Sequence, residues 1–219
     1  MNLSQLKESF EVIRLKGDKA ETVEKAVEYA NACQQVRKYD TAIACLNKVD
    51  VEGDANLEAV LKTALGTAFW EKAQLQKSLN HFEEALKLFK ECDDKLGVSA
   101  ILSIVGITFW RKCDWDKALE ILKDALDQKT EKDGRFASLY GAFDRGIVRL
   151  QNRVRMGREL DDPLKTLQPL FSASALYLIT GKLDEMTTCL EESVLLAEQL
   201  GKTDILTAAN DLNRLVESA

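Results

Sequence analysis

Side chains that could do chemistry are few in this 219-residue sequence, and their spacing fits no catalytic motif. His81 is the single histidine, so no second histidine can complete a zinc site or a proton relay. Its neighbours Asn80 and Phe82 favour a partly exposed histidine on a helix. Ser4 and Lys7 match a Ser-x-x-Lys spacing, but the companion Ser-Asp-Asn and Lys-Thr-Gly motifs are missing. We therefore expect no enzymatic activity, no metal and no cofactor.

The cysteines and the hydropathy pattern bear on where the protein works. An odd number of cysteines without a Cys-x-x-Cys pair is typical of free thiols in a reducing cytosol. No stretch approaches the roughly 20 apolar residues of a membrane span, and charges run through residues 1–16 where a signal peptide would be apolar. We expect a cytoplasmic protein without a membrane segment. Its five cysteines are Cys33, Cys45, Cys92, Cys113 and Cys189.

Overall composition indicates a helical protein with a sizeable core. Hydrophobic residues make up 46% of the chain, and only 2 prolines and 11 glycines interrupt it, too few for the turns of a β-sandwich or barrel. The 36 acidic residues outnumber the 30 Lys and Arg residues, which gives a net charge of −6. This balance disfavours nucleic acid as a partner.

An internal repeat is the strongest pattern. The segment Leu65–Trp70 (LGTAFW) recurs forty positions later, from 65 to 105, as Val105–Trp110 (VGITFW). Each copy is followed by a short polar break and by a second segment with apolar residues at three- and four-residue intervals. Each copy therefore predicts two antiparallel helices, which can approach closely at Gly66 and Gly106 because glycine has no side chain.

These residues resemble the tetratricopeptide repeat (TPR) family. The family pattern has Leu-Gly, an aromatic three residues after the Gly, and then Ala-x-x-x-Phe, whose places Ser78 and Phe82 take in the first copy. Because no proline closes either central repeat, the likeness is to the long-repeat type found in kinesin light chains and LGN-like adaptors. The resemblance implies an all-α fold, a right-handed superhelix of antiparallel helix pairs.

The pattern divides the chain, taken as one domain, into consecutive pieces. In residues 133–168 we expect a long basic first helix and a short second helix that begins at Pro163, with Pro169 ending it or beginning the next one. The pieces are an N-terminal helix at 1–16, a weak repeat at 20–50, repeats at 56–93 and 97–128, a degenerate helix pair at 133–168, a weak repeat at 170–200 and a C-terminal capping helix at 203–218.

The resemblance also implies a binding groove lined by one face of the first helices. Trp70 and Trp110 lie on that face of successive repeats, and aromatic side chains supply much of the binding energy at interfaces. The alternative is that both rings pack in the core or are covered by another helix of the same chain. The implied groove residues are Val60, Thr63, Ala64, Thr67, Trp70, Glu71, Ala100, Ser103, Ile104, Ile107, Trp110 and Arg111.

Three functions stay open at this point. The first is a non-catalytic scaffold or adaptor that binds a peptide or helix of another protein in the apolar groove. The second is an assembly factor or regulatory subunit that contacts RNA or an acidic or phosphorylated partner through the helix Arg135–Arg158, because guanidinium groups pair well with anions. The third is an accessory subunit of an enzyme. The basic patch comprises Arg145, Arg149, Arg153 and Arg155.

Two further expectations concern partners. TPR clamps for the acidic tails of the chaperones Hsp70 and Hsp90 use cationic and amide side chains in the groove, yet only Asn31 matches among the equivalent positions, so we expect no such clamp. The apolar stripe of residues 1–16 caps the first repeat, docks in the groove or pairs with a second copy of the protein. The positions equivalent to the clamp residues include Val27, Asn31, Ala64, Ala100 and Ile104.

Overall fold

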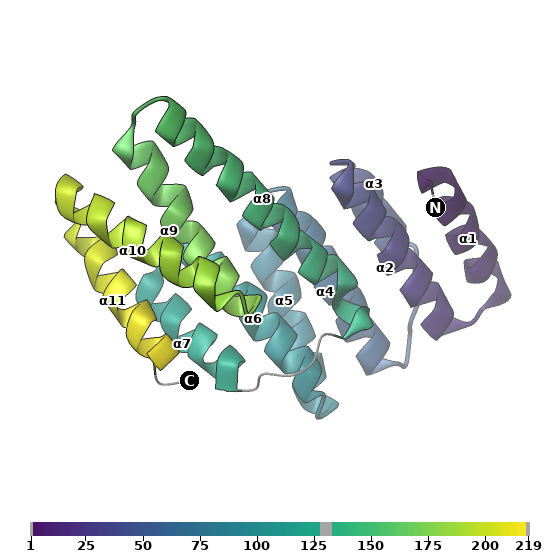
Figure 1. The fold of residues 1–219 in the computed structure, drawn as a ribbon. Coiled ribbons are helices and arrows are strands. Elements are labelled where there is room, and N and C mark those ends of the chain that lie inside the picture. Colours follow the sequence, from purple (N-terminus) through teal and green to yellow (C-terminus); the bar gives the residue numbers. More distant parts are fainter. Residues whose placement is uncertain (1, 128–132, 218–219) are drawn as a thin grey trace. The chain divides into compact units, whose positions relative to one another are not determined.

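The computed structural model describes residues 2–127 and 133–217, and within these ranges it contains helices and no strands (Figure 1). The all-α prediction is confirmed. The helices are α1 Leu3–Lys16, α2 Lys19–Gln35, α3 Tyr39–Leu46, α4 Ala55–Glu71, α5 Leu75–Glu91, α6 Lys95–Arg111, α7 Trp115–Asp127, the 3-10 turn η1 Gly134–Phe136, α8 Ala137–Glu159, α9 Pro163–Ile179, α10 Leu183–Leu200 and α11 Thr203–Glu217.

The chain forms two compact units whose segments alternate along the sequence. Unit 1 comprises Met1–Ile104 and Gln128–Ala142. Unit 2 comprises Val105–Asp127 and Phe143–Ala219. The helices α6 and α8 each contribute residues to both units.

Polar side chains fix where several helices begin. Asn2 and Gln5 form a reciprocal capping box at α1. Asp18, Asp54 and Asp162 each accept the backbone N–H three residues ahead, at 2.9 to 3.0 Å, and so cap α2, α4 and α9. Each such cap stabilises its helix by about 1 kcal/mol.

Neighbouring helices are joined by a recurring tight turn that needs no glycine. After α4, the N–H of Gln74 donates to the carbonyl of Phe69 at 2.9 Å, and Ala73 adopts a left-handed φ of 62°. After α6, Asp114 donates to Phe109 at 3.1 Å and Cys113 has a φ of 60°. These bonds satisfy carbonyls at the helix ends, which offsets the strain of a left-handed non-glycine residue.

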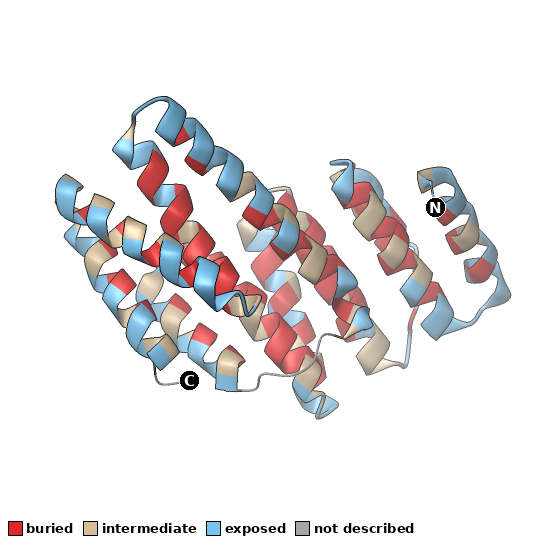
Figure 2. Cartoon of the chain, viewed as in Figure 1, coloured by how far each residue is buried: buried red, intermediate tan, exposed pale blue. Residues whose placement is uncertain are grey.

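Close helix contacts in unit 1 depend on glycine. The helices α4 and α5 pack together, as do α2 and α3, and α1 covers α2. Gly66 of α4 faces the ring of Phe82, and a Cβ at this position would lie 2.5 Å from that ring. Phe82 is fully buried within unit 1, where the red segments of Figure 2 run along the facing sides of these helices. The packing predicted from the repeated Leu-Gly motif is therefore present.

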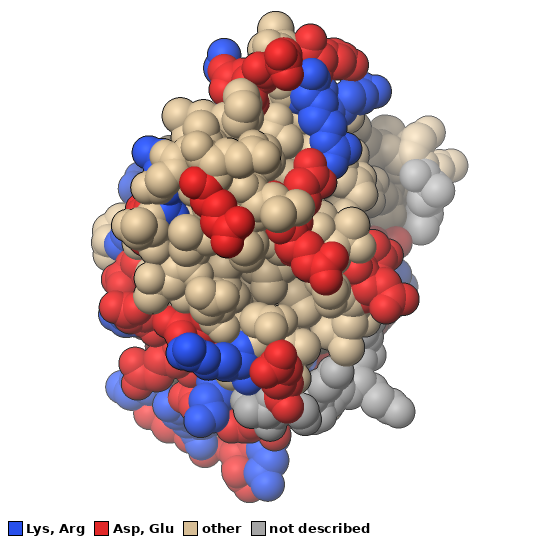
Figure 3. Space-filling view, turned by 60° about the vertical axis from the view of Figure 1, so that its left-hand side comes forward, with Lys and Arg blue, Asp and Glu red and all other residues tan. Residues whose placement is uncertain are grey.

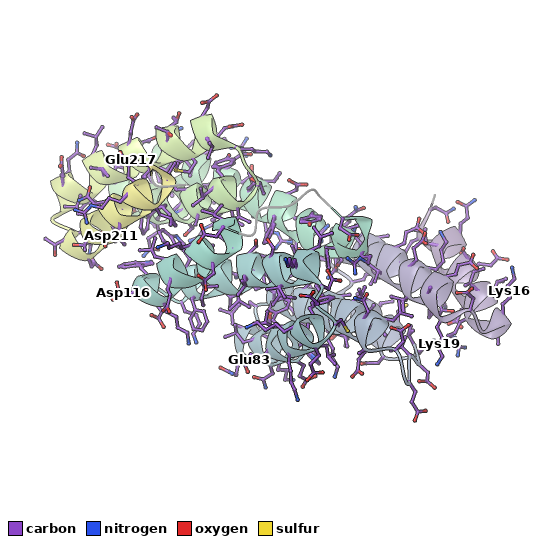
Figure 4. All side chains as sticks on the ribbon, turned by 90° about the horizontal axis from the view of Figure 1, so that it is seen from below. Lys16, Lys19, Glu83, Asp116, Asp211 and Glu217 are labelled. Carbon is purple, nitrogen blue, oxygen red and sulfur yellow. The ribbon has the colours of Figure 1, made fainter. Side chains whose placement is uncertain are left out.

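The N-terminal helix packs as the capping interpretation expects. Leu6, Phe10 and Ile13 of α1 are buried, and the ring of Phe10 stacks on Tyr29 of α2 with centroids 6.5 Å apart. Self-association through this helix stays a prediction. Charged side chains, including Lys16 at its end, point outward (Figure 4).

Unit 2 contains α7, α9, α10 and α11, with α9 against α10 and α11 against both α10 and α7. The prediction for Pro169 is wrong, because this proline lies inside α9 and the expected division at residues 168 to 170 falls within a helix. A proline inside a helix costs about 3 kcal/mol. Burial of Pro169, Leu167, Leu170 and Phe171 offsets that cost, since each large apolar side chain contributes roughly 1.5–3 kcal/mol when buried.

Within the described part of the chain, none of the helices is long and apolar enough to cross a bilayer.

Replacing Gly66 with alanine tests the close approach of α4 and α5. The new methyl group would collide with Phe82, and overpacking of this kind lowers the free energy of unfolding by about 1–3 kcal/mol. The roughly 1 kcal/mol that alanine gains in helix propensity offsets only part of this loss. Urea denaturation measures the difference. Gly134→Ala is the matched control because no atom lies within 4 Å of the added Cβ; equal stability of the two variants would contradict the packing.

Candidate functional site

The predicted groove residues of α4 are covered. All six of them, from Val60 to Glu71, are buried, and Trp70 is only 2% exposed. The hydroxyls of Thr63 and Thr67 donate to carbonyls of the same helix at 2.8 Å, so these side chains need no outside partner. A partner therefore has no direct access to this row of side chains.

The predicted groove residues of α6 are mostly covered as well. Ala100 and Ile104 are buried and Ser103 is half-buried in unit 1. In unit 2, Ile107 and Trp110 are buried, whereas Arg111 is exposed. Binding of a partner by these groove residues stays a prediction.

Trp110 is a packing residue of unit 2. Its side chain is 2% exposed, and its Nε1 donates to the carbonyl of Phe171 in α9 at 3.2 Å. The ring centroids of Trp110 and Phe171 lie 4.7 Å apart, and Trp115 meets the Phe171 ring edge-on at 5.7 Å. For Trp110 the structure thus matches the core interpretation that the sequence left open.

In unit 1, a short segment far along the chain lies against the helices at the front of the sequence. This segment, which we name the strap, comprises residues 133–138, that is Asp133, the turn η1 and the start of α8 (Figure 1). Ser138 donates from its hydroxyl to Oε1 of Gln34 in α2 at 2.8 Å. Phe136 is 1% exposed and meets Phe89 of α5 edge-on, with ring centroids 5.6 Å apart.

An arginine anchors the strap. Nη1 of Arg135 lies 2.6 Å from Oδ2 of Asp94 and 3.0 Å from Oδ1 of Asn56, while its Nε donates to Asp133 at 2.8 Å. Asp94 precedes α6 and Asn56 lies in the first turn of α4, so one guanidinium joins two helices to the strap. The Asp94 side chain is 11% exposed and that of Arg135 is 34% exposed.

The ionic contacts hold both groups in their charged forms. Burial alone would raise the pKa of Asp94, but hydrogen bonds from Arg135, the Gly97 N–H and Asn56 lower that pKa below its ordinary value. Burial would lower the pKa of Arg135, and its bonds to Asp94 and Asp133 raise that pKa instead. The strap therefore stays ion-paired at neutral pH.

One buried group beneath the strap is incompletely bonded. The carboxamide of Gln34 is fully buried; its oxygen accepts the Ser138 hydroxyl, whereas its Nε2 has no partner in the residues that the structure describes. A buried donor without an acceptor costs about 1–3 kcal/mol. Gln34 was not identified from the sequence, because a glutamine at the end of a helix is normally solvated.

The predicted basic patch lies in unit 2 and extends beyond the predicted residues. Arg145 and Arg149 are half-buried, and Arg153 and Arg155 are exposed. Arg111 of α6 is exposed over part of its side chain, but the protein atoms packed around its guanidinium, and then the positive charges of Arg149 and Arg153, lower its pKa, which indicates that Arg111 lies near these two arginines. The sequence suggested a different role for Arg111, in the groove, because it is far from α8 in the chain.

Two arginines near the C-terminal end of α8 lie close to acidic side chains. Arg158 pairs with Glu192 at 2.5 Å, and Arg155 lies 3.8 Å from Glu159. On the face shown in Figure 3, uncharged and acidic side chains occupy the middle, and Lys and Arg lie near the edges.

His81 lies on α5 and is half-buried. Its ring stacks on Phe69 with centroids 5.3 Å apart, and its Nδ1 is buried without a partner among the described residues. In residues 2–127 and 133–217, no group of three His, Cys, Asp or Glu side chains is placed to hold a metal ion.

Truncation of Trp110 tests its role in the core. Trp110→Ala should lower the free energy of unfolding by about 3–5 kcal/mol, because a buried ring and its hydrogen bond to Phe171 are lost. Chemical denaturation followed by circular dichroism gives the value. Trp115→Ala, at a half-buried ring that also touches Phe171, should cost less. A loss near 0.5 kcal/mol for Trp110→Ala, as at surface positions, would contradict the assignment.

Acidification tests the environment of His81. Burial, the largest effect, lowers the pKa of His81 below 6.5, while Glu84 raises it and Lys62 lowers it. The unfolded chain therefore binds a proton near pH 6.5 that the folded chain does not bind. The contribution of His81 to the free energy of unfolding is thus fully present above pH 6.5 and is lost as the pH drops below that value. In His81→Gln this loss below about pH 6.5 should disappear. Urea midpoints at several pH values measure it; an unchanged slope in the variant would contradict the assignment.

Comparisons with known proteins agree with the arrangement of the chain in helix pairs. Residues 57–131 match the family described as Tetratricopeptide repeat. No curated protein matches the sequence closely enough to count as a relative. The crystal structure of BtubC (BKLC) from P. vanneervenii is similar in fold, with 18% identity, a TM-score of 0.53 and 91% of each chain covered.

Two other solved structures are similar at a lower level. A crystal structure of the Podosopora anserina putative kinesin light chain nearly identical TPR-like repeats has 14% identity and a TM-score of 0.44, with 81% of this chain and 95% of that chain covered. The MamA protein has 15% identity and a TM-score of 0.39, with coverages of 91% and 94%. Residues 57–131 of this chain thus match the tetratricopeptide repeat family, and the helix pairs closed at Gly66 and Gly106 lie within that match.

Proposed function

We propose that this protein is a non-catalytic adaptor that binds a segment of another protein on the helices of unit 1. Tetratricopeptide repeats form helical scaffolds that generally take part in protein–protein interaction and are typically non-catalytic. The adaptor role goes beyond that general statement, because a fold alone does not establish function.

One observation carries the proposal: unit 1 already holds a polypeptide segment by its side chains. The strap contacts Gln34 of α2, Asn56 of α4 and Asp94 before α6. These positions come from three successive first helices, or from the residue that precedes one, so a short peptide can bridge several repeats. The buried groove residues Val60 to Glu71 would support this surface from α4 without touching the partner.

The cysteines support a cytoplasmic location. All five are free thiols, two of them, Cys33 and Cys45, buried. Burial raises the pKa of both thiols, that of Cys45 to about 12, which keeps them protonated and unreactive. A protein with five unpaired thiols is suited to a reducing compartment.

A second candidate function rests on the cationic cluster of unit 2. The charges of Arg149 and Arg153 act on Arg111, so three guanidinium groups from two helices lie near one another, and guanidinium groups pair well with acidic or phosphorylated groups. Binding at this cluster would weaken steeply with salt, since released counterions drive such association.

Affinity capture with the full chain tests the adaptor role. Asp94→Lys reverses a charge on the strap-binding surface, and Asp184→Lys reverses an exposed charge at the start of α10 in unit 2. We expect at least one protein retained by the wild type and by Asp184→Lys to be lost at least about tenfold with Asp94→Lys, because the reversed charge repels a cationic anchor. Quantitative mass spectrometry measures retention.

Two outcomes would contradict the proposal. Equal retention of every protein by Asp94→Lys and Asp184→Lys would exclude binding at unit 1. Loss only on Arg149→Glu or Arg153→Glu would move the working surface to the cationic cluster. Far-UV circular dichroism verifies that each variant is folded.

A further inference from the structure

We propose that the strap is an internal ligand of unit 1, and that the partner segment which replaces it presents the same groups: an arginine, an aromatic residue directly after it and a hydrogen-bonding residue two positions further on. This inference rests on the adaptor function and names the chemistry of its partner. In the strap these groups are Arg135, Phe136 and Ser138.

The site for the arginine is built by unit 1 without the strap. Oδ1 of Asp94 accepts the backbone N–H of Gly97 at 2.9 Å, and Oδ2 accepts Nδ2 of Asn56 at 3.0 Å. These bonds fix the carboxylate in place. A guanidinium fits because its Nη1 reaches Oδ2 of Asp94 and Oδ1 of Asn56 within 3.0 Å while its Nη2 lies 3.5 Å from Oδ1 of Asp94, and an ammonium has no second nitrogen to complete this fork.

The site for the aromatic residue is equally fixed. Phe136 rests edge-on against Phe89, which is itself fully buried. Gly97 lies so close to the Phe89 ring that a Cβ there would be 2.4 Å away, so the ring has no room to turn aside. The guanidinium of Arg135 lies 5.2 Å from the centre of the Phe136 ring, and this cation–π contact couples the two anchor positions.

The third site shows why a partner can compete with the strap. Gln34 is fully buried and receives the Ser138 hydroxyl on its oxygen, but its Nε2 finds no acceptor among the described residues. A partner that brings an acceptor here, a backbone carbonyl or a side-chain oxygen, completes a bond that the strap leaves unmade. The strap therefore leaves one hydrogen bond of this site unmade.

Because the strap is part of the same chain, it competes with a separate partner segment for the binding surface of unit 1. Among the described residues, 105–127 and those from 143 onward belong to unit 2, and the segment 133–142 between them belongs to unit 1. A tethered segment competes at an effective concentration of about 1 mM. A free peptide of equal intrinsic affinity should thus bind the wild type much more weakly than a variant whose strap is loosened.

A peptide in trans provides the test. The probe is a fluorescent, capped peptide of residues 133–140, DGRFASLY, titrated into the full chain and followed by anisotropy. Binding to the double variant Arg135→Ala/Ser138→Ala should be at least about tenfold tighter than to the wild type. Adding Asp94→Ala to that variant, or replacing the peptide's arginine with alanine, should weaken binding at least about tenfold.

The peptide test must be made on protein that is shown to be folded. If the double variant keeps its circular dichroism spectrum yet does not bind the peptide, or binds a scrambled peptide equally, the proposal is overturned. If the double variant does not fold, the wild type serves instead. At millimolar peptide, the backbone amides of residues 133–142 should then exchange hydrogen faster, and unchanged exchange would overturn the proposal.

The peptide and capture experiments separate the two proposals. Loss of a captured partner on Asp94→Lys without peptide binding would leave the adaptor role and reject the arginine-aromatic chemistry. If the peptide binds but Asp94→Lys leaves the captured proteins unchanged, the strap is an internal ligand and the adaptor role at this surface is rejected.

Discussion

The close approach of helices at glycine is the constraint on which the rest of the structure depends. Gly66 faces Phe82, Gly97 faces Phe89, and Gly106 faces Leu122, each at a distance that excludes a Cβ atom. Gly157 does the same between α8 and α9, where a Cβ would lie 2.6 Å from the hydroxyl of Thr166. These contacts set how near neighbouring helices lie, and Phe89, wedged against Gly97, in turn supports Phe136 of the strap.

Much of the fold could be predicted from the sequence, because its signals are local. The repeated Leu-Gly and aromatic spacing lies within single helix pairs, and the helix start at Pro163 follows from a few adjacent residues. The expectation for Pro169 failed because burial along α9 outweighs the local preference of proline. Local propensity cannot report how much apolar surface a helix buries against distant partners.

The candidate site was harder to predict, because its contacts join distant residues. Ser138 and Gln34 are 104 positions apart, and Arg135 reaches Asn56 across 79 positions. Nothing in the spacing of either pair indicates that they meet. The groove residues were chosen for their face of the helix, and that face is the one the folded chain covers, as at Trp70 and Trp110. Arg111 was missed in the cationic cluster for the same reason, since Arg149 lies on another helix.

The alternation of the two units along the sequence has a consequence for biosynthesis. Residues emerge from the ribosome in order, so the first 104 residues of the chain are made before the segment 133–142 that joins them in unit 1. Until then, Asp94 and the buried carboxamide of Gln34 lack the partners that the strap brings. Contacts of long sequence separation form late because the entropy of loop closure opposes them. A nascent chain therefore exposes the surface that the strap later covers, and in this interval chaperones have access to that surface.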